Sequence, residues 1–510
     1  MTQAYIGMDI GTGSTKAVLC STEGQILHSA TRGHEMLIPR PGWAEFDPQG
    51  VWWEEICSLG RELMAHAEGT EILGMCVSGM GPCVVLTDDR LEPVRPAILY
   101  GIDMRAHREI LEQTRRYGEE TILADCGTAL SSQAVGPKIE WVRNHEPEVF
   151  ARATRVFGVN SYIAAKLTGA YVQDHHSASQ SDPLYSMPRG ASEGDTADGD
   201  ADRAGHWDAA RWQDICGPLA QPELVWPHEV VGTVHEAAAE ATGIPRGTPV
   251  SAGSVDAWVE ALSAGVRAPG ELMMMYGSTM FLTHTVSEVS AHPQLWSTNG
   301  IFPGTLTLAA GMATSGSLLG WWQKQLGDLS FPELDALARE VPPGADGLLS
   351  LPYYAGERTP IFDPRARGAL VGLTLSHGRG HMIRAQYEGI GFAVRQVLAL
   401  LESQTEPVTR IVAVGGGAQS PVWTQAVSDI TGREQEVPEQ TIGASYGDAL
   451  LAAIGTGHED PGTSWARTAD VVRPREEHRE LYNRLFHDYE ALYPALKDVM
   501  HDLADVQGQS

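Results

Sequence analysis

Cysteine and long apolar runs are scarce in this sequence of 510 residues. The six cysteines form no Cys-x-x-Cys pair and no Cys/His cluster at zinc spacing, which argues against a disulfide framework and a structural zinc site. No basic segment followed by an apolar one opens the chain, and no apolar run approaches the length that crosses a bilayer. We therefore expect a cytoplasmic protein with reduced thiols and no membrane partner.

Positive charge is also scarce. The sequence holds 36 Lys and Arg residues against 65 Asp and Glu residues, a formal net charge of −29 at pH 7. Such a surface repels nucleic acid and anionic membranes, so neither is expected as a partner. An anionic ligand would have to be held locally, by backbone N–H groups and a metal ion.

The common nucleotide-binding signatures are missing as well. The sequence has no Gly-x-x-x-x-Gly-Lys-[Ser/Thr], no Gly-x-Gly-x-x-Gly after a strand and no Asp-Phe-Gly. P-loop, Rossmann and protein-kinase folds therefore lose their main support.

What the sequence does have is a candidate phosphate-binding hairpin near its start. Residues 5–10 and 16–19 are typical of strands, and a Gly-Thr-Gly-Ser-Thr turn separates them. Glycines let backbone N–H groups approach an anion closely, and hydroxyls add donors. Asp9 ends the first strand, where a carboxylate would repel phosphate unless Mg2+ stood between them. An ordinary hairpin is the alternative. The predicted phosphate ligands are Gly11, Thr12, Gly13, Ser14, Thr15 and Lys16.

A similar strand, turn and strand recurs at residues 272–282, with Gly277, Ser278 and Thr279 in the turn. Strands alternate with helical patterns, at about 106–124 and 138–170 in the first half, which is typical of an α/β fold. The paired hairpins suggest two related domains that face one ligand. Gly and Pro break regular structure at 243–249, so we expect domains at 1–246 and 247–510, the first with an exposed acidic insertion at about 186–206.

Asp256 is the candidate catalytic base. It follows a strand and a Gly-Ser-Val turn, at the beginning of a helical pattern with Trp258, Val259 and Leu262. A plain N-cap aspartate is the alternative. A helix N-terminus lowers the pKa of a carboxylate and makes it a weak base. A weak base is adequate for phosphoryl transfer through a loose transition state, because the base mainly orients the hydroxyl and accepts its proton late.

Two other patterns suggest different chemistry. Residues 443–447 fit the Gly-x-Ser-x-Gly elbow of hydrolases with Ser445 as nucleophile, but the segment before it is a poor buried strand. This favours a serine at a helix start beside Asp448. His175 and His176 follow Asp174 and suggest a metal site, but adjacent side chains on a strand point to opposite faces, which favours a polar loop.

Four motifs, taken in order, resemble those of the FGGY carbohydrate kinases, and among them the xylulokinase branch. The motifs are Gly7-x-Asp9-x-Gly11-Thr12-x-Ser14-x-Lys16, Pro41-Gly42-Trp43-Ala44-Glu45-x-Asp47-Pro48, Gly356-Glu357-Arg358-Thr359-Pro360 with Asp363-Pro364-x-Ala366-Arg367-Gly368, and Gly415-Gly416-Gly417-Ala418. The match spans nearly the whole chain. It implies two ribonuclease-H-like domains of the actin-like ATPase type, closing over a cleft that holds a sugar and Mg-ATP.

The resemblance also implies roles for individual residues. Asp9 is similar to the family's metal-site aspartate, and Asp256 is similar to its catalytic base. The turns at 12–15 and 277–279 resemble its two phosphate loops. The residues that match the adenosine-binding region are Gly416, Gly417, Ala418 and Ser420.

The segments that resemble the family's sugar site differ from its usual sequence. Residues 80–83 stand where xylulokinases have Gln-Met-His-Gly, and Ala257 replaces the Asn that follows the catalytic aspartate. Asp103 and Arg105 are similar to the Asp-x-Arg after the family's Ile-Leu-Trp strand. The predicted acceptor contacts are Met80, Gly81, Pro82, Asp103, Arg105, Asp256 and Ala257.

The expected activity is ATP-dependent phosphorylation of a terminal hydroxyl of a small sugar, and the resemblance favours a ketopentose such as xylulose. Ribulose, a tetrulose or an alditol are alternative acceptors. An actin-like or chaperone-like ATPase without a sugar acceptor is an alternative of another class. The expected cofactors are ATP and Mg2+. The sequence decides no oligomeric state, and a homodimer is one option.

Overall fold

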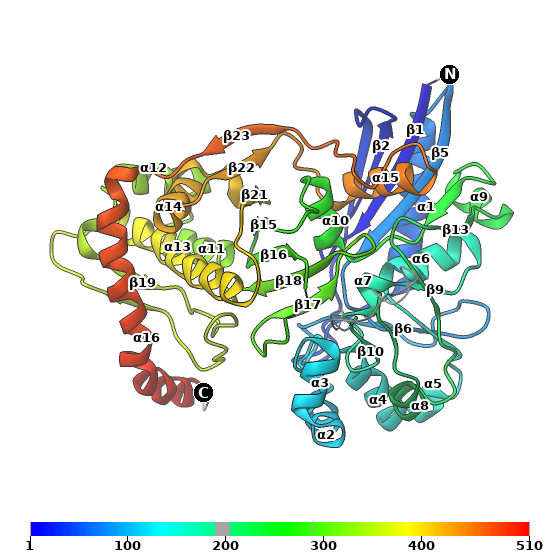
Figure 1. Ribbon diagram of the computed structural model, residues 1–510, viewed down its shortest axis with the longest axis horizontal. Coiled ribbons are helices and arrows are strands. Elements are labelled where there is room, and N and C mark those ends of the chain that lie inside the picture. The colour runs from blue at the N-terminus through cyan, green and yellow to red at the C-terminus, as the bar shows by residue number, and fades with distance from the viewer. Residues whose placement is uncertain (1, 189–203, 289, 509–510) are drawn as a thin grey trace, which may run out of the picture.

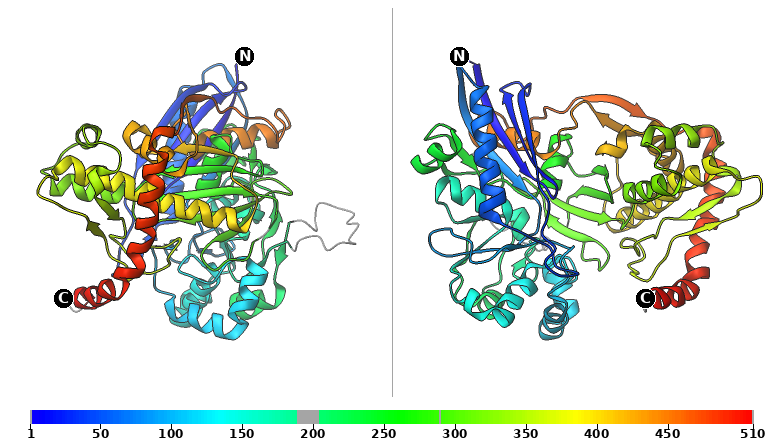
Figure 2. Two further views of the ribbon diagram at one scale, coloured as in Figure 1. Left: turned by 60° about the vertical axis from the view of Figure 1, so that its left-hand side comes forward. Right: turned by 180° about the vertical axis from the view of Figure 1, so that it is seen from behind.

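The computed structural model describes residues 2–188, 204–288 and 290–508. The chain forms two halves, each built around one large sheet (Figures 1 and 2). Most of the acidic insertion predicted at 186–206 lies outside the described residues. The segments that flank it pair as β10 (Tyr185–Ser186) and β11 (His206–Trp207).

The first half contains a six-stranded sheet with β1 near its centre. Strand β1 pairs antiparallel with β2 and parallel with β5, which confirms the predicted first hairpin. In spatial order the strands are β13 (Val230–Thr233), β14 (Pro249–Ser251), β5 (Thr70–Gly79), β1 (Thr2–Ile10), β2 (Ser14–Ser21) and β3 (Ile26–Gly33). Strand β14 follows the domain boundary expected at residue 246, yet it lies in this first sheet.

Helices cover both faces of this sheet, and each face buries alternate side chains of β1. Ile6 and Met8 pack in the same cluster as α1 (Glu54–Ala65), which lies across the outer face (Figure 2). Tyr5 packs with α15 (Ala444–Gly455) on the inner face. By the same alternation Asp9 faces α15, although that helix comes from the other end of the chain.

The second half contains a seven-stranded sheet. Strands β15 and β16 form the second predicted hairpin, with Tyr276 opposite Met280. In spatial order the strands are β17 (Trp296–Asn299), β18 (Leu306–Gly311), β16 (Met280–Val286), β15 (Glu271–Tyr276), β21 (Arg410–Val414), β22 (Gln435–Pro438) and β23 (Thr468–Val472). Side chains of β15 such as Met274 share a core with α13 (Arg379–Gln404), α14 (Pro421–Thr431) and α16 (Arg479–Gly508).

Two helices lie between the sheets and join the halves. Helix α10 (Asp256–Ser263) packs against α15, and the two share an apolar cluster that includes Val259 and Leu450 (Figure 1). Ala261 of α10 also packs with Met273 and Val412 of the second sheet. The N-terminus of α10 is therefore held at the junction of the halves.

Smaller elements complete the chain. In the first half they are β4 (Glu45–Phe46), a π-helix (Pro48–Trp53), β6 (Val85–Thr87), β7 (Ala97–Ile98), α2 (His107–Tyr117), α3 (Glu119–Cys126), α4 (Val135–His145), α5 (Pro147–Phe150), β8 (Arg155–Phe157), α6 (Val159–Thr168), β9 (Val172–Asp174), α7 (His175–Ala178), α8 (Ala209–Cys216), β12 (Glu223–Val225) and α9 (Glu236–Thr242). In the second half they are α11 (Gly316–Gln325), α12 (Phe331–Arg339), β19 (Leu349–Leu351) and β20 (Ala369–Val371), with 3-10 turns at Ala345–Gly347, Gly416–Gln419 and Glu476–His478.

The helical pattern predicted over 138–170 is interrupted. Strand β8 separates α4 and α5 from α6, because its backbone pairs with that of β6 and Phe157 fills the core of the first half. No helix in the described part of the chain is both long and apolar enough to span a membrane.

Candidate active site

A cavity of about 430 Å³ lies between the halves and is lined by both hairpins. It collects predicted residues that are far apart in the sequence. The predicted residues that line it are Asp9, Gly11, Thr12, Gly13, Ser14, Lys16, Met80, Gly81, Pro82, Asp256, Ala257 and Thr279. The structure thus brings the predicted base, metal-site aspartate, phosphate turns and sugar loop to one place.

The turn of the first hairpin lines this cavity with consecutive residues, whereas its strands present alternate residues to it. Asp9 lies opposite Lys16 in the β1–β2 register, and both line the cavity. Thr15 does not, contrary to the prediction: its side chain is fully buried and its hydroxyl donates to Glu55 Oε2 at 2.5 Å. The physical reason is strand alternation, which turns Thr15 to the face opposite Lys16.

Asp256 is the first residue of α10 rather than its N-cap. Val255 occupies the cap position, so the N-cap alternative is wrong. Asp256 Oδ1 accepts a hydrogen bond of 2.7 Å from the N–H of Ala257. Burial nevertheless raises the pKa of Asp256, whereas the helix position alone predicted a lowered one. Desolvation outweighs the helix terminus here, and the carboxylate is a stronger base than expected.

Carboxylates crowd this end of the cavity. Burial, together with Asp256 and Asp448, raises the pKa of Asp9 well above its usual range. Burial and the nearby Asp256 raise the pKa of Glu260 to about 7, and Lys16 opposes this rise. Sequence reasoning missed Glu260, although its spacing of four from Asp256 places both on one helix face. Such crowding of like charges favours binding of a cation.

A groove of about 920 Å³ adjoins the cavity and shares Lys16, Glu260 and Met275 with it. Gly277, Gly416 and Ala418 line this groove, as predicted for a nucleotide site. The residues predicted there that lie outside its lining are Ser278, Gly417 and Ser420.

Gly417 and Ser420 have structural roles instead. A Cβ on Gly417 would lie 2.3 Å from the Trp423 ring, so the glycine permits close packing. Ser420 caps α14 by accepting from the N–H of Trp423 at 3.1 Å, and it donates to Asp335 at 2.8 Å.

Asp103 and Arg105 also differ from the prediction that they touch the acceptor. Both side chains are fully buried and paired with each other at 2.7 Å, outside the lining of the cavity. Asp103 accepts from the N–H of Ala44 at 2.7 Å, and the Arg105 guanidinium lies 4.0 Å over the Trp43 ring. The pair therefore fixes the loop around Trp43 rather than lining the cavity.

Several cavity-lining residues were not predicted. They are Tyr100, Thr128, Gln133, Ser179, Gln180, Asp182, Trp258, Trp296, Ser297, Thr298 and Arg358 among others. Tyr100 shares a hydrogen bond of 2.6 Å with Thr12. Arg358 lies inside the quoted Gly-Glu-Arg-Thr-Pro motif, so the motif itself was a signal for it. The polar residues at 128–133 and 179–182 carried no sequence pattern that identifies a site.

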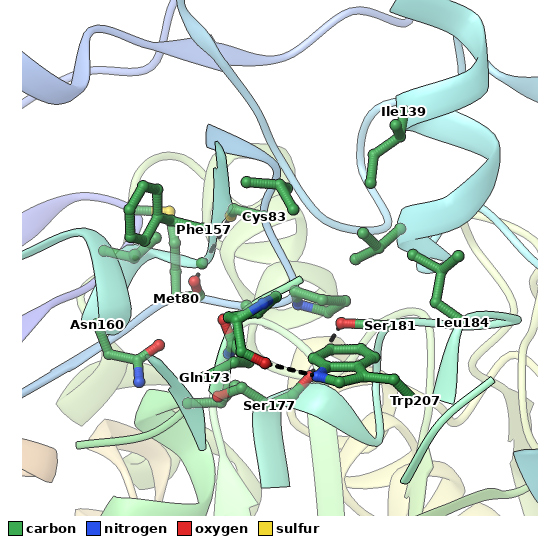
Figure 3. Close-up of a pocket in the computed structure, with 18 of the residues that line it drawn as sticks. Met80, Cys83, Ile139, Phe157, Asn160, Gln173, Ser177, Ser181, Leu184 and Trp207 are labelled. Carbon is green, nitrogen blue, oxygen red and sulfur yellow. Dashed lines mark hydrogen bonds between the residues drawn. The ribbon is translucent and has the colours of Figure 1, made fainter. Parts of the chain in front are cut away.

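A second pocket of about 30 Å³ lies behind the Met80 loop. The polar side chains of Asn160, Gln173 and Ser177 lie on one side of it, opposite Ile139 and Leu184 (Figure 3). Its volume suits one or two water molecules. This pocket is therefore too small for a sugar.

The rival chemistries find no support in the geometry. Ser445 is fully buried inside α15, and its hydroxyl has no partner among the described residues. His175 and His176 begin the short helix α7, a local structure that differs from the predicted loop, and His176 Nδ1 contacts the Asn299 carbonyl at 2.6 Å. Within the ranges that the structure describes, no three His, Cys, Asp or Glu side chains form a metal cluster.

Comparison with known proteins places this architecture in a family. Residues 4–190 match the N-terminal domain, and residues 272–456 the C-terminal domain, of the FGGY family of carbohydrate kinases. The chain is 27% identical to a xylulose kinase of Bacillus subtilis, covering 97% of each chain. It is 30% identical to a gluconokinase of the same organism, covering 99% of each. A crystal structure of xylulose kinase from Rhodospirillum rubrum superposes with a TM-score of 0.87 at 33% identity, covering 98% of this chain and 100% of that one. The chain, with its two hairpin-bearing halves and the cavity between them, therefore belongs to the FGGY family of carbohydrate kinases.

Proposed function

We propose that this carbohydrate kinase transfers the γ-phosphoryl group of ATP to a terminal hydroxyl of a ketopentose of the xylulose type. The observation that carries the proposal is the place of Asp256, a buried carboxylate at the start of α10 in a cavity lined by two phosphate-type hairpins. The xylulose kinases among its relatives support the acceptor class.

In the proposed reaction Asp256 accepts the proton of the acceptor hydroxyl. The hydroxyl oxygen bonds to the γ-phosphorus as the bond between that phosphorus and the ADP oxygen breaks. The N–H of Ala257 holds Asp256 Oδ1 at 2.7 Å, which fixes the carboxylate toward the cavity. Its raised pKa makes it a better proton acceptor than an exposed aspartate.

Asp9 would hold the Mg2+ that accompanies ATP. Its carboxylate is buried and lines the cavity, and its one hydrogen-bond contact within the described residues is Ser78 Oγ at 3.5 Å. A carboxylate so poorly satisfied suits Mg2+, which takes one or two carboxylates and completes its coordination with phosphate and water. The bound ion would neutralise phosphate charge during the transfer.

Polar side chains away from the hairpins would receive the sugar. Gln133 accepts from the N–H of Gly101 with its oxygen, which leaves its amide N–H groups for the cavity. Asp182 also lines the cavity, and its Oδ1 has no partner in the described part of the chain. Burial raises the pKa of Asp182, which favours the protonated carboxyl, a hydrogen-bond donor.

A sugar acid such as gluconate is the second candidate acceptor. The guanidinium of Arg358 lines the cavity and donates to the Met312 carbonyl at 2.7 Å, and it makes no ion pair with a carboxylate of the described residues. A cavity-facing guanidinium is suited to bind a carboxylate. The 30% identity to a gluconokinase points the same way.

The decisive experiment is ADP release with a panel of acceptors: xylulose, ribulose, a tetrulose, an alditol and gluconate. We expect the highest kcat/KM with xylulose, and we expect Asp256→Asn to lower kcat with it by about 100- to 10,000-fold. Arg358→Gln separates the two acceptors, because it should impair gluconate far more than xylulose if the guanidinium binds a carboxylate. A folded Asp256→Asn protein with normal turnover would refute the assignment of the base.

A further inference from the structure

The Gly-x-Ser-x-Gly stretch that resembled a hydrolase elbow serves close packing in this fold. A Cβ on Gly7 would lie 1.9 Å from the Ser445 carbonyl oxygen, and one on Gly447 would lie 2.3 Å from the Val259 carbonyl oxygen. Helix α15 therefore lies directly on β1 and on α10. This contact brings Asp448, one turn into the helix, to the inner face of the first sheet.

Asp448 is fully buried there and holds the end of β5. Its Oδ2 accepts from the Ser78 hydroxyl at 2.6 Å and from the Ser78 N–H at 3.1 Å. Its Oδ1 receives no hydrogen bond from an N–H or O–H group of the described residues, and the Cys76 thiol is a weak donor beside this carboxylate. Ser78 lies opposite Asp9 in the β1–β5 register, and its hydroxyl is 3.5 Å from Asp9 Oδ1.

Fold stability alone does not explain a carboxylate at this position. Burying a carboxylate costs free energy unless it is paired or fully hydrogen-bonded, and one oxygen of Asp448 is not. The next three residues of α15, which are also buried, are apolar: Ala449, Leu450 and Leu451. Packing at this position would be served by an apolar side chain of the same kind. The contact of Asp448 with Ser78 suggests instead an effect on Asp9, because the same hydroxyl lies next to Asp9.

The Ser78 hydroxyl has one hydrogen to donate, and two carboxylates lie within reach as acceptors. The 2.6 Å distance to Asp448 is that of a strong hydrogen bond, whereas 3.5 Å to Asp9 is at the limit. While the Ser78 hydroxyl donates its hydrogen bond to Asp448, Asp9 has no close donor. The Asp9 oxygens are then available to a cation. If Asp448 were removed, the hydroxyl could turn to Asp9 and compete with that cation.

We propose that Asp448 is a positioning residue that holds the Ser78 hydroxyl away from Asp9 and so keeps the Asp9 carboxylate free for the divalent cation that accompanies ATP. This inference rests on the proposed function, because that function assigns the cation to Asp9. Asp448 touches neither substrate nor cation and acts through Ser78.

Cation binding without turnover tests this directly. Mn2+ is titrated into the protein with saturating ADP and no acceptor, and binding is followed by electron paramagnetic resonance. We expect Asp448→Ala to weaken Mn2+ binding by about tenfold, the range of one charge-assisted hydrogen bond. Asp448→Asn keeps a side-chain oxygen that can still accept from Ser78, so it should weaken binding less. The double variant Asp448→Ala/Ser78→Ala removes the competing hydroxyl and should recover most of the lost affinity.

The Mn2+ affinity of the double variant separates this role from a purely structural one, because removing Ser78 would not restore affinity lost through a disturbed fold. Equal weakening by Asp448→Ala and Asp448→Asn, or no recovery in the double variant, would overturn the inference. Asp429→Ala serves as the matched control, because Asp429 is also buried in a helix but pairs with Arg475, and it should leave Mn2+ binding in place. Circular dichroism verifies the fold of each variant.

Kinetics separates this inference from the proposed function. In the active kinase Asp448→Ala should raise the Mg2+ concentration needed for half-maximal rate more than it lowers kcat at saturating Mg2+. A wild-type protein that phosphorylates none of the acceptors refutes the proposed function, while the Mn2+ titration still decides the role of Asp448.

Discussion

The two hairpins have the same backbone design but opposite chemistry. In the first, Asp9 is the penultimate residue of β1 and lies opposite Lys16. In the second, Met275 is the penultimate residue of β15 and lies opposite Phe281. All four line the same cavity.

From this difference we expect the two halves to have different roles in binding ATP. Backbone N–H groups of either turn can approach phosphate, because both turns are short and rich in glycine and hydroxyls. Of the hairpin residues that line the cavity, the charged ones, Asp9 and Lys16, belong to the first hairpin. We therefore expect the cation and the phosphate charge on that side. The second hairpin contributes the apolar side chains of Met275 and Phe281 to the cavity, and apolar walls strengthen the electrostatic interactions inside a site.

The largest effect on kcat should come from substituting the penultimate residue of the first strand in each hairpin. Asp9→Asn should lower kcat by about 100- to 1,000-fold, as for the loss of a main electrostatic group, whereas Met275→Leu should cost far less because it preserves volume. Steady-state kinetics at saturating Mg2+ measures both. Similar losses for the two variants would break the proposed division of roles.

Lys16 should have the next largest effect. Lys16→Met removes a charged donor next to the groove, and we expect the KM for ATP to rise by about 10- to 100-fold. Phe281→Leu is the matched variant on the other hairpin and should change this KM much less. An unchanged KM in Lys16→Met would contradict a phosphate contact of Lys16.

Unfolding measurements should show how closely α15 packs on the first hairpin. Gly7→Ala places a Cβ against the backbone of α15, and overpacking of this kind should lower the free energy of unfolding by roughly 1–3 kcal/mol or more. Gly13→Ala is the control, because a Cβ there meets no atom within 4 Å. Urea unfolding measures both. Equal stabilities would mean that α15 does not clamp the first hairpin.

The smallest effect concerns pH. Burial raises the pKa of Asp256 to about 6, and the base must be ionised to accept a proton. The kcat/KM for the acceptor should therefore fall as pH drops below about 6, approaching tenfold per pH unit, and level off above it. A rate profile that stays flat down to pH 5 would show that this carboxylate is not the base.

Local sequence was enough to predict both hairpins and less than half of the residues that line the cavity. Gly-rich turns between apolar strands predicted both hairpins, and helical periodicity predicted the helices around them. The prediction of Thr15 as a phosphate ligand did not take strand alternation into account. The prediction of Asp103 as an acceptor contact rested on a motif match, which does not say which way a side chain points. The 138–170 region failed because β8, at three residues, is too short to interrupt a helical pattern visibly.

The sequence by itself was enough to identify the family and the two hairpins and to predict Asp256 as the candidate base, because turn chemistry, apolar periodicity and ordered motifs are local properties of the chain. Tertiary structure alone decided which residues meet. It brought Asp448 to Ser78 across 370 positions of sequence and set Glu260 beside Lys16. It also turned the expected lowering of the Asp256 pKa into a rise, because desolvation depends on what the rest of the chain packs around a group.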